Sequence, residues 1–287
     1  MGVLKMWTKD KEKMKLPQRY NYAEAYLTFR CNLNCDYCIN KFGEFTRRDE
    51  LTAEEWADAL NRIDFGNVAL TLGGGEPTLY KGFYELVDRL NMPIDLLTNL
   101  QFDVEEFIKR VNPDKFSESE IPFHHPIRAS YHAEQMDRDQ TIKKMRRLRN
   151  AGFNAGLFGI RHPYLINENM AMAFLTSKAG IPFYEKDFLG EVDGRMYGFF
   201  KYPEGLSKKL NPVLCRTREL LIASDGLAYR CHRDLYKGEN PIGDIRTMEK
   251  IEDIFRPCKS FGECNPCDVK LKTNKYLEEV DCQVEIK

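Results

Sequence analysis

Short apolar runs alternate with amphipathic segments from residue 23 to residue 184. Six of these runs predict buried strands, at 25–29, 68–72, 93–97, 127–131, 155–160 and 181–184. Apolar residues at helical spacing predict the helices between them, at 80–90, 104–110, 135–151 and 167–179. One more helix is expected after Thr52, because Glu55 three residues later completes a capping box.

This alternation predicts an α/β fold with a parallel sheet and right-handed crossovers. Six strand–helix units form a partial (β/α)6 TIM-like barrel, which we expect to span residues 23–187 after an N-terminal extension at 1–22. In such a barrel, functional residues lie in the loops that follow the carboxyl ends of the strands.

The pattern changes after residue 188. Glycine and proline break every helical period there, and two short strands at 220–223 and 227–230 flank a Ser224-Asp225-Gly226 turn. We therefore expect residues 188–287 to form a linker and a small C-terminal domain with a β-hairpin and helices.

Composition excludes several classes of protein. The 287 residues carry a net charge of −1, and no nucleic-acid motif is present. No apolar stretch is long enough to span a bilayer, and the lysine-rich N-terminus lacks the apolar core of a secretion signal. We expect a cytoplasmic protein without membrane or nucleic-acid partners. In that reducing compartment, nine cysteines favour metal or redox chemistry over disulfides.

The most informative motif is a cysteine triplet, Cys31, Cys35 and Cys38, directly after the first predicted strand. A [4Fe–4S] cluster normally takes four thiolates. Three thiolates from one loop leave the fourth iron open to a substrate, as catalytic zinc sites keep one position free. A zinc knuckle or a disulfide loop is the alternative, although zinc sites favour pairs of Cys-x2-Cys.

The triplet, with Tyr37 directly before its last cysteine, resembles the signature of the radical S-adenosylmethionine (SAM) superfamily. The resemblance implies a [4Fe–4S] cluster held by three cysteines and SAM, whose reductive cleavage yields a 5'-deoxyadenosyl radical. It also implies a reducing partner such as flavodoxin or ferredoxin.

A SAM site is implied at the next strand ends. Residues 74–77 match the Gly-Gly-Glu-Pro segment that binds the amino group of methionine in this family. Polar residues after the third and fourth strands suit the remaining polar groups of SAM, and the fifth strand suits adenine. The resulting candidates are Tyr37, Gly74, Gly75, Glu76, Pro77, Thr98, Asn99, Ser130, His132 and Ile160. A purely structural role remains open for His132.

A second cysteine set lies in the C-terminal part. Cys215, Gly226-x4-Cys231 and Cys264-x2-Cys267 resemble the twitch domain, a shortened SPASM domain that holds one auxiliary [4Fe–4S] cluster. The resemblance implies that Cys215, Cys231, Cys264 and Cys267 are its ligands. Cys258 can replace one of them, Cys282 is expected to be a spare thiol, and a four-cysteine zinc site is the alternative.

The two clusters predict a reaction. Hydrogen abstraction from a carbinol, followed by loss of an electron to the auxiliary cluster and of a proton, gives a ketone. Since 1–22 is too short to fold as a leader-binding domain, we expect a small hydroxylated substrate such as a sugar, polyol or nucleotide-linked sugar. The alternatives are a peptide-modifying radical SAM enzyme and a non-catalytic electron carrier or zinc-stabilised binding protein. Candidate catalytic residues are Arg161, Tyr184, Glu185 and Asp187.

Overall fold

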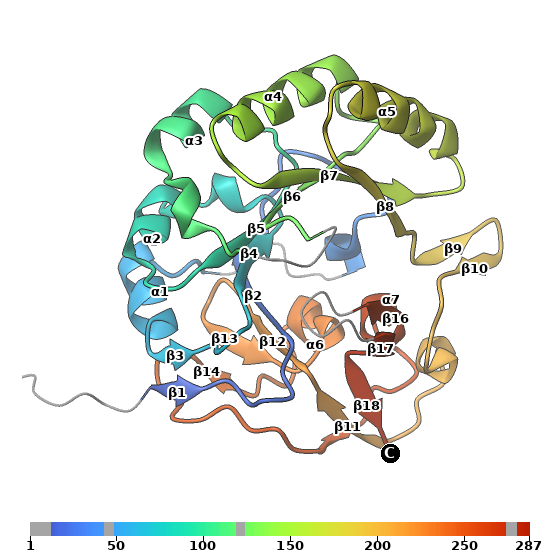
Figure 1. Ribbon diagram of the computed structural model, residues 1–287. Helices are drawn as coiled ribbons and strands as arrows, with labels where there is room; N and C mark the ends of the chain where they lie inside the picture. Colours follow the sequence, from blue (N-terminus) through green and yellow to red (C-terminus); the bar gives the residue numbers. More distant parts are fainter. Residues whose placement is uncertain (1–12, 43–48, 119–123, 274–279) are drawn as a thin grey trace, which may run out of the picture.

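The computed structural model describes residues 13–42, 49–118, 124–273 and 280–287. Residues 1–12 of the predicted N-terminal extension lie outside this part of the chain. The dominant element is a nine-stranded sheet that curls into an incomplete barrel (Figure 1). In spatial order its strands are β14 (Gly243–Asp244), β13 (Leu227–Tyr229), β12 (Glu219–Ile222), β2 (Tyr22–Thr28), β4 (Leu70–Gly74), β5 (Ile94–Thr98), β6 (Ile127–Ser130), β7 (Ala155–Arg161) and β8 (Phe183–Asp187).

Every pairing from β12 to β8 is parallel, as the strand–helix alternation predicts. All six predicted strands are present, with ends within three residues of the expected ones. The predicted fold class, a partial barrel of α/β type, is confirmed.

Five helices cover the outer side of the sheet, as an arc in Figure 1. They are α1 (Ala53–Leu60), α2 (Phe83–Arg89), α3 (Val104–Arg110), α4 (Arg138–Asn150) and α5 (Ile166–Lys178). The predicted capping box starts α1: Glu55 N donates to Thr52 Oγ1 at 3.2 Å, and Thr52 N donates to the Glu55 carboxylate at 2.8 Å. No helix in the described part of the chain has the length and apolar character needed to cross a bilayer.

The two faces of the sheet differ in chemistry. On β2, Ala23, Ala25 and Leu27 face the helices and belong to the main hydrophobic core. The alternate residues of this strand include Glu24 and Tyr26, which face inward because successive strand side chains point to opposite sides. The outer face is therefore a packed core, whereas the inner face carries polar groups.

The C-terminal hairpin extends the main sheet. Strand β12 pairs in parallel with β2, in the register Glu219↔Tyr22 to Ile222↔Ala25, and β13 pairs antiparallel with β12. The strands predicted at 220–223 and 227–230 are therefore both present, but they close one side of the barrel instead of standing apart from it.

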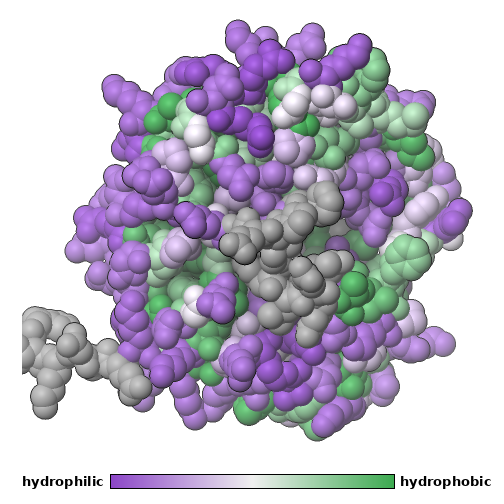
Figure 2. All heavy atoms as spheres, viewed as in Figure 1, coloured by the Kyte–Doolittle hydropathy of each residue, from purple (hydrophilic) through white to green (hydrophobic). Residues whose placement is uncertain are grey.

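Of the remaining elements, α6, β11 and β18 lie in the lower part of Figure 1, and β9 and β10 lie at its right. The short helices are α6 (His232–Lys237), α7 (Pro266–Val269), η1 (Ile39–Phe42), η2 (Pro77–Leu79), η3 (Pro113–Lys115) and η4 (Pro203–Leu206). The small sheets contain β1 (Met14–Lys15) with β3 (Ile63–Asp64), β9 (Gly190–Val192) with β10 (Arg195–Tyr197), β16 (Leu271–Thr273) with β17 (Val280–Cys282), and β15 (Arg256–Cys258), β11 (Val213–Thr217) and β18 (Val284–Ile286). Figure 2 shows a mainly hydrophilic face with a hydrophobic area near the β9–β10 hairpin, where Met196 and Phe199 are exposed.

Candidate active site

The cysteine triplet lies in the loop that β2 delivers to the carboxyl edge of the sheet. Cys31 is exposed, Cys35 is buried and Cys38 is half-buried. The loop turns back on itself, since Cys38 N donates to Cys35 O at 3.1 Å and Leu33 N donates to Cys31 Sγ at 3.4 Å. The sequence thus brings three thiols to one short turn, at the edge where a barrel of this type carries its chemistry.

Side-chain amides from two other strand ends point at these sulfurs. Gln135 Nε2 lies 3.2 Å from Cys35 Sγ, and Asn99 Nδ2 lies 3.7 Å from Cys31 Sγ. Burial raises the pKa of Cys31; the Leu33 N–H opposes this, and the Glu76 and Cys38 charges add to it. N–H donors stabilise sulfur that carries negative charge. The surroundings of the triplet therefore fit a cluster held by thiolates.

The glycine segment is fixed by close approach to the cysteine loop. Gly75 N donates to Thr28 O at 2.8 Å, and Glu76 N donates to Arg30 O at 2.8 Å. A β-carbon on Gly75 would lie 2.1 Å from Arg30 O, and one on Gly74 would lie 2.2 Å from Thr28 O. Gly74 also has φ +127°, a conformation that favours glycine. The two glycines are therefore required for the two loops to meet.

Glu76 is fully buried at the centre of a hydrogen-bond network. Its carboxylate accepts from Thr98 Oγ1 at 2.9 Å and from Asn99 N at 2.7 Å. It also accepts from the hydroxyl and amide of Thr78. Burial raises the pKa of this carboxyl, and the four donors oppose that rise. Hydrogen bonds thereby join three predicted cofactor residues, Glu76, Thr98 and Asn99, next to Cys31.

Tyr37 and His132 form a second pair next to the triplet. Their rings stack at 5.8 Å between centroids, and the Tyr37 hydroxyl lies 3.0 Å from His132 Nδ1. Burial lowers the pKa of His132 to about 4 and raises that of Tyr37. A neutral imidazole accepts at Nδ1 from the protonated phenol and keeps its hydrogen on Nε2, so His132 can donate one hydrogen bond to a ligand.

The other predicted cofactor residues are distributed around the same edge. Pro77 is buried at the start of η2, Ser130 ends β6 and Ile160 is near the end of β7. Within the described residues, Ser130 Oγ has no hydrogen-bond partner, which leaves it free for a ligand hydroxyl or carboxylate.

The four predicted catalytic residues do not share one face. Glu185 Oε1 accepts from Asn169 of α5 at 2.9 Å, so Glu185 faces the helices. Arg161 forms ion pairs with Glu185 at 3.6 Å and with Asp187 at 3.3 Å on that outer side. Tyr184 faces inward, where its ring stacks on His125 at 5.6 Å. The structure therefore leaves only Tyr184 inside the barrel.

Several inward-facing residues were not anticipated from the sequence. Lys186 shares the inner face of β8 with Tyr184 and lies over the Phe158 ring at 5.1 Å. Glu24 accepts from the Tyr22 hydroxyl at 2.8 Å, and Arg128 pairs with the buried Asp95 at 2.7 Å. Strict alternation along β2 and β8 is the signal that could have identified Glu24 and Lys186.

The second cysteine set gathers in the C-terminal part. Cys215, Cys231, Cys258 and Cys264 line one pocket, whereas Cys267 does not line it. Burial raises the pKa of Cys264 to about 12 and raises that of Cys215, where the neighbouring Cys258 and Cys264 thiols add to the effect. Cys282 lies outside the pocket, and its Sγ donates to Asp268 O at 3.1 Å.

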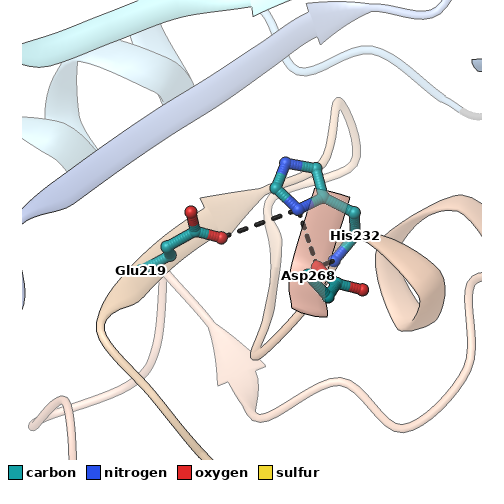
Figure 3. A group of neighbouring side chains, drawn as sticks. All are labelled: Glu219, His232 and Asp268. Carbon is teal, nitrogen blue, oxygen red and sulfur yellow. Dashed lines mark hydrogen bonds and ion pairs between the residues drawn. The ribbon is translucent and has the colours of Figure 1, made fainter. Parts of the chain in front are cut away.

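Beside this pocket, Glu219, His232 and Asp268 converge from three elements (Figure 3). His232 Nδ1 lies 2.8 Å from Asp268 Oδ1 and 3.6 Å from Glu219 Oε2. Lys272 Nζ lies 2.5 Å from Glu219. Burial lowers the pKa of His232, but the Cys267, Glu219 and Asp268 charges outweigh burial and raise it to about 10. The two carboxylates thus already have two cationic partners, which makes this an ion-pair network instead of a metal site.

The network also orients Cys231. Asp268 accepts from the backbone N–H groups of His232 at 2.8 Å and Arg233 at 3.1 Å. These are the free donors of the first turn of α6, for which Cys231 is the N-cap.

The fold and the cysteine loop define a partial-barrel protein with a thiol-rich site at the carboxyl edge of its parallel strands. The sequence profile of the Radical SAM superfamily matches residues 26–175, just over half of the 287 residues. The chain therefore belongs to the radical SAM superfamily, whose members use a [4Fe–4S] cluster and SAM.

Two curated relatives share part of the sequence. The PqqA peptide cyclase of Streptomyces rochei is 38% identical over 77 residues, which cover 25% of this chain and 21% of that protein. The PqqA peptide cyclase of Rhizobium meliloti (strain 1021) is 38% identical over 77 residues, covering 26% and 20%. The matched region is thus about a fifth of the length of each relative.

Solved structures share the fold. SuiB of Streptococcus suis aligns with a TM-score of 0.54 at 14% identity, over 80% of this chain and 64% of that chain. Native anSMEcpe with bound AdoMet aligns at 0.55 and 14% identity, over 85% and 81%. BtrN in complex with AdoMet and 2-DOIA aligns at 0.50 and 14% identity, over 91% and 98%.

Proposed function

We propose that this radical SAM enzyme modifies a peptide. The observation that carries the proposal is the 38% identity to two PqqA peptide cyclases over 77 residues. In support, anSMEcpe, which shares the fold at a TM-score of 0.55, was solved with AdoMet and a peptide bound. A peptide is favoured over the small hydroxylated substrate expected from the sequence, because both of these relatives are named as peptide cyclases.

Different residues of the chain have different roles at the site. Cys31, Cys35 and Cys38 would hold the first cluster, which would supply the electron for reductive cleavage of SAM. The backbone of Gly74 and Gly75 offers polar groups to the methionine part of SAM, and Asn40 Nδ2 fixes that backbone by donating to Gly74 O at 2.9 Å. His132 and Ser130 offer hydrogen bonds to the other polar groups of SAM.

The pocket of Cys215, Cys231, Cys258 and Cys264 suits an auxiliary cluster. Four thiols that line one pocket form a donor set that suits a thiophilic metal centre. In this proposal, a cluster held by these four cysteines would supply the acceptor for the electron that the substrate loses. That role makes the overall reaction an oxidation of the substrate.

The test uses synthetic copies of short peptides that are encoded by genes next to the gene for this protein. The reconstituted enzyme, incubated anaerobically with SAM, dithionite and such a peptide, is expected to release 5'-deoxyadenosine and to return the peptide lighter by two hydrogen atoms. Mass spectrometry measures both products. An unchanged peptide, together with deuterium transfer to deoxyadenosine from a deuterated aminocyclitol or sugar alcohol, would exclude the peptide proposal.

That second outcome corresponds to a second candidate function, oxidation of a small hydroxylated substrate. The observation that favours it is the alignment with BtrN in complex with AdoMet and 2-DOIA, which covers nearly the whole of both chains. Under this candidate, a carbinol radical would lose a proton and one electron, for which the auxiliary cluster would supply the acceptor, and the product would be a ketone.

Lys186 is the substrate contact with the clearest expected effect. Its side chain lies on the inner face of β8 over the Phe158 ring, and it forms no ion pair with a carboxylate in the described part of the chain. A peptide carboxylate is the natural partner. Lys186→Met is expected to raise KM for an acidic peptide about 10- to 100-fold, the effect of losing a charged hydrogen bond of about 1.5–3 kcal/mol. Lys178→Met, on the outer helix α5, is the control and should leave KM unchanged.

The same lysine predicts a pH dependence. Burial, followed by the Arg128 and Lys270 charges, lowers the pKa of Lys186 to about 8. The ammonium that attracts a carboxylate is present below this pKa and is lost above it. We therefore expect kcat/KM for an acidic peptide to fall as the pH rises through about 8. A fall of the same size in the Lys186→Met variant would assign the effect to another group.

A further inference from the structure

The pocket of the second cysteine set is built from four separate segments. Cys215 comes from β11, Cys231 from the N-cap of α6, Cys258 from β15, and Cys264 from the loop before α7. The remaining lining combines apolar side chains, among them Val213 and Phe261, with charged ones, among them Arg230 and Asp268. All four residues are free cysteines that line the same pocket, and no disulfide links them.

The register of β11 and β15 brings Cys215 and Cys258 to one face. Cys215 lies opposite Arg256, and Cys258 lies opposite Val213. Cys258 is therefore two residues from the position opposite Cys215. Diagonal neighbours of this kind point to the same side of a sheet. This relation is a property of the strand pairing itself, so it does not depend on a side-chain rotamer.

The other two thiols are held by local contacts. Cys264 N donates to Gly205 O at 2.8 Å, and a β-carbon on Gly205 would lie 3.2 Å from Cys264 Sγ, so the glycine leaves room for the sulfur. Cys231 Sγ accepts from Asp234 N at 3.4 Å. A backbone N–H that points at a sulfur suits a thiolate ligand.

Cys267 faces a different environment. Its Sγ lies 4.0 Å from Lys272 Nζ, and Lys272 is bound to Glu219 of β12 at 2.5 Å. Asn265, the N-cap of α7, accepts from Cys267 N at 2.8 Å and thereby holds the backbone of Cys267 in the first turn of this helix. Cys264 lies outside α7, whereas Cys267 lies within it, so the two members of the Cys-x2-Cys pair point to different places.

We propose that Cys215, Cys231, Cys258 and Cys264 are the ligands of the second cluster, and that Cys267 is not a ligand. This assignment rests on the proposed presence of an auxiliary cluster. Compared with the ligand set that the spacing Cys264-x2-Cys267 favours, the assignment includes Cys258 in place of Cys267. Cys267 then becomes a free thiol on the side of α7 that faces Lys272 and Glu219.

The test uses a background variant that can hold only the second cluster, Cys31→Ala/Cys35→Ala/Cys38→Ala. After anaerobic reconstitution, we expect about four irons per chain and an equal amount of acid-labile sulfide. Adding Cys258→Ser should reduce the iron to below about one per chain, whereas adding Cys267→Ser should leave about four. Electron paramagnetic resonance of the reduced samples reports the same cluster independently of any substrate.

The reverse pattern, with iron retained by Cys258→Ser and lost from Cys267→Ser, overturns the assignment. Zinc in place of iron in the background variant also overturns it. Cys258→Ser in the chain with an intact triplet controls for folding and should keep about four irons and SAM binding. If that variant does not fold, the Cys267→Ser arm alone decides, because loss of its cluster contradicts the proposal. No substrate enters these measurements, so failure of the peptide proposal would not change their result.

Discussion

Replacing Cys35 by alanine is expected to abolish release of 5'-deoxyadenosine. Cys35 is the buried member of the triplet, and Gln135 donates to its sulfur at 3.2 Å. A cluster held by two thiolates lacks an essential ligand, so the variant should hold about four irons per chain where the unmodified protein holds about eight. Iron analysis and mass spectrometry of the nucleoside products measure both effects.

Cys282→Ala is the matched control for this substitution. Cys282 is also a buried thiol, but it lies outside the second cysteine pocket and donates to a backbone carbonyl. This variant should keep its iron and its deoxyadenosine release. Equal losses in both variants would show that removal of any buried thiol, instead of a cluster ligand, is responsible.

Gly75→Ala is expected to destabilise the fold and to weaken SAM binding. The new β-carbon would lie 2.1 Å from Arg30 O and 2.8 Å from Phe29 O. Both are backbone atoms, so no side chain can move to relieve the contact. Overpacking of this kind costs about 3 kcal/mol of unfolding free energy. Relief of this contact requires the cysteine loop and the glycine segment to move apart. We therefore expect SAM affinity to fall at least about tenfold.

Gly66→Ala separates this steric effect from the loss of a glycine as such. Gly66 has φ +59°, and a β-carbon there would meet nothing within 4 Å. The Gly66→Ala substitution should lower the free energy of unfolding by about 1 kcal/mol, because alanine disfavours this backbone conformation. The affinity of this variant for SAM should be unchanged. Urea denaturation and calorimetry of both variants provide the comparison. A Gly75→Ala protein as stable as Gly66→Ala would contradict the close approach of the two loops.

The parts of the site that the sequence predicts are those with local signals. The triplet and the glycine segment each follow directly from one strand, and the capping box of Thr52 and Glu55 spans four residues. Such features depend on neighbours along the chain, and the structure has all three where the sequence places them.

The parts that were missed depend on partners far apart in sequence. The pairing of β12 with β2 joins Leu220 to Ala23, and no local pattern specifies that partner. The expected strand at 25–29 starts three residues later than β2, so it does not include Glu24. On β8, side-chain alternation separates Tyr184 and Lys186 on the inner face from Glu185 on the outer face.

The cysteine assignment shows the same limit. The spacing Cys264-x2-Cys267 suggests a shared metal centre, but spacing does not determine the direction of each thiol. Residues after Asn265 enter α7, which turns Cys267 away from Cys264. Only the register of β11 with β15 reveals that Cys258 lies beside Cys215.

The most direct test of the account is the reaction of the reconstituted protein with SAM alone. Under anaerobic conditions with dithionite, the full chain is expected to contain about eight irons and to release 5'-deoxyadenosine and methionine. Iron analysis and mass spectrometry measure these quantities. A protein loaded with both clusters that binds SAM but releases no deoxyadenosine would contradict the assignment of the triplet as a radical SAM site.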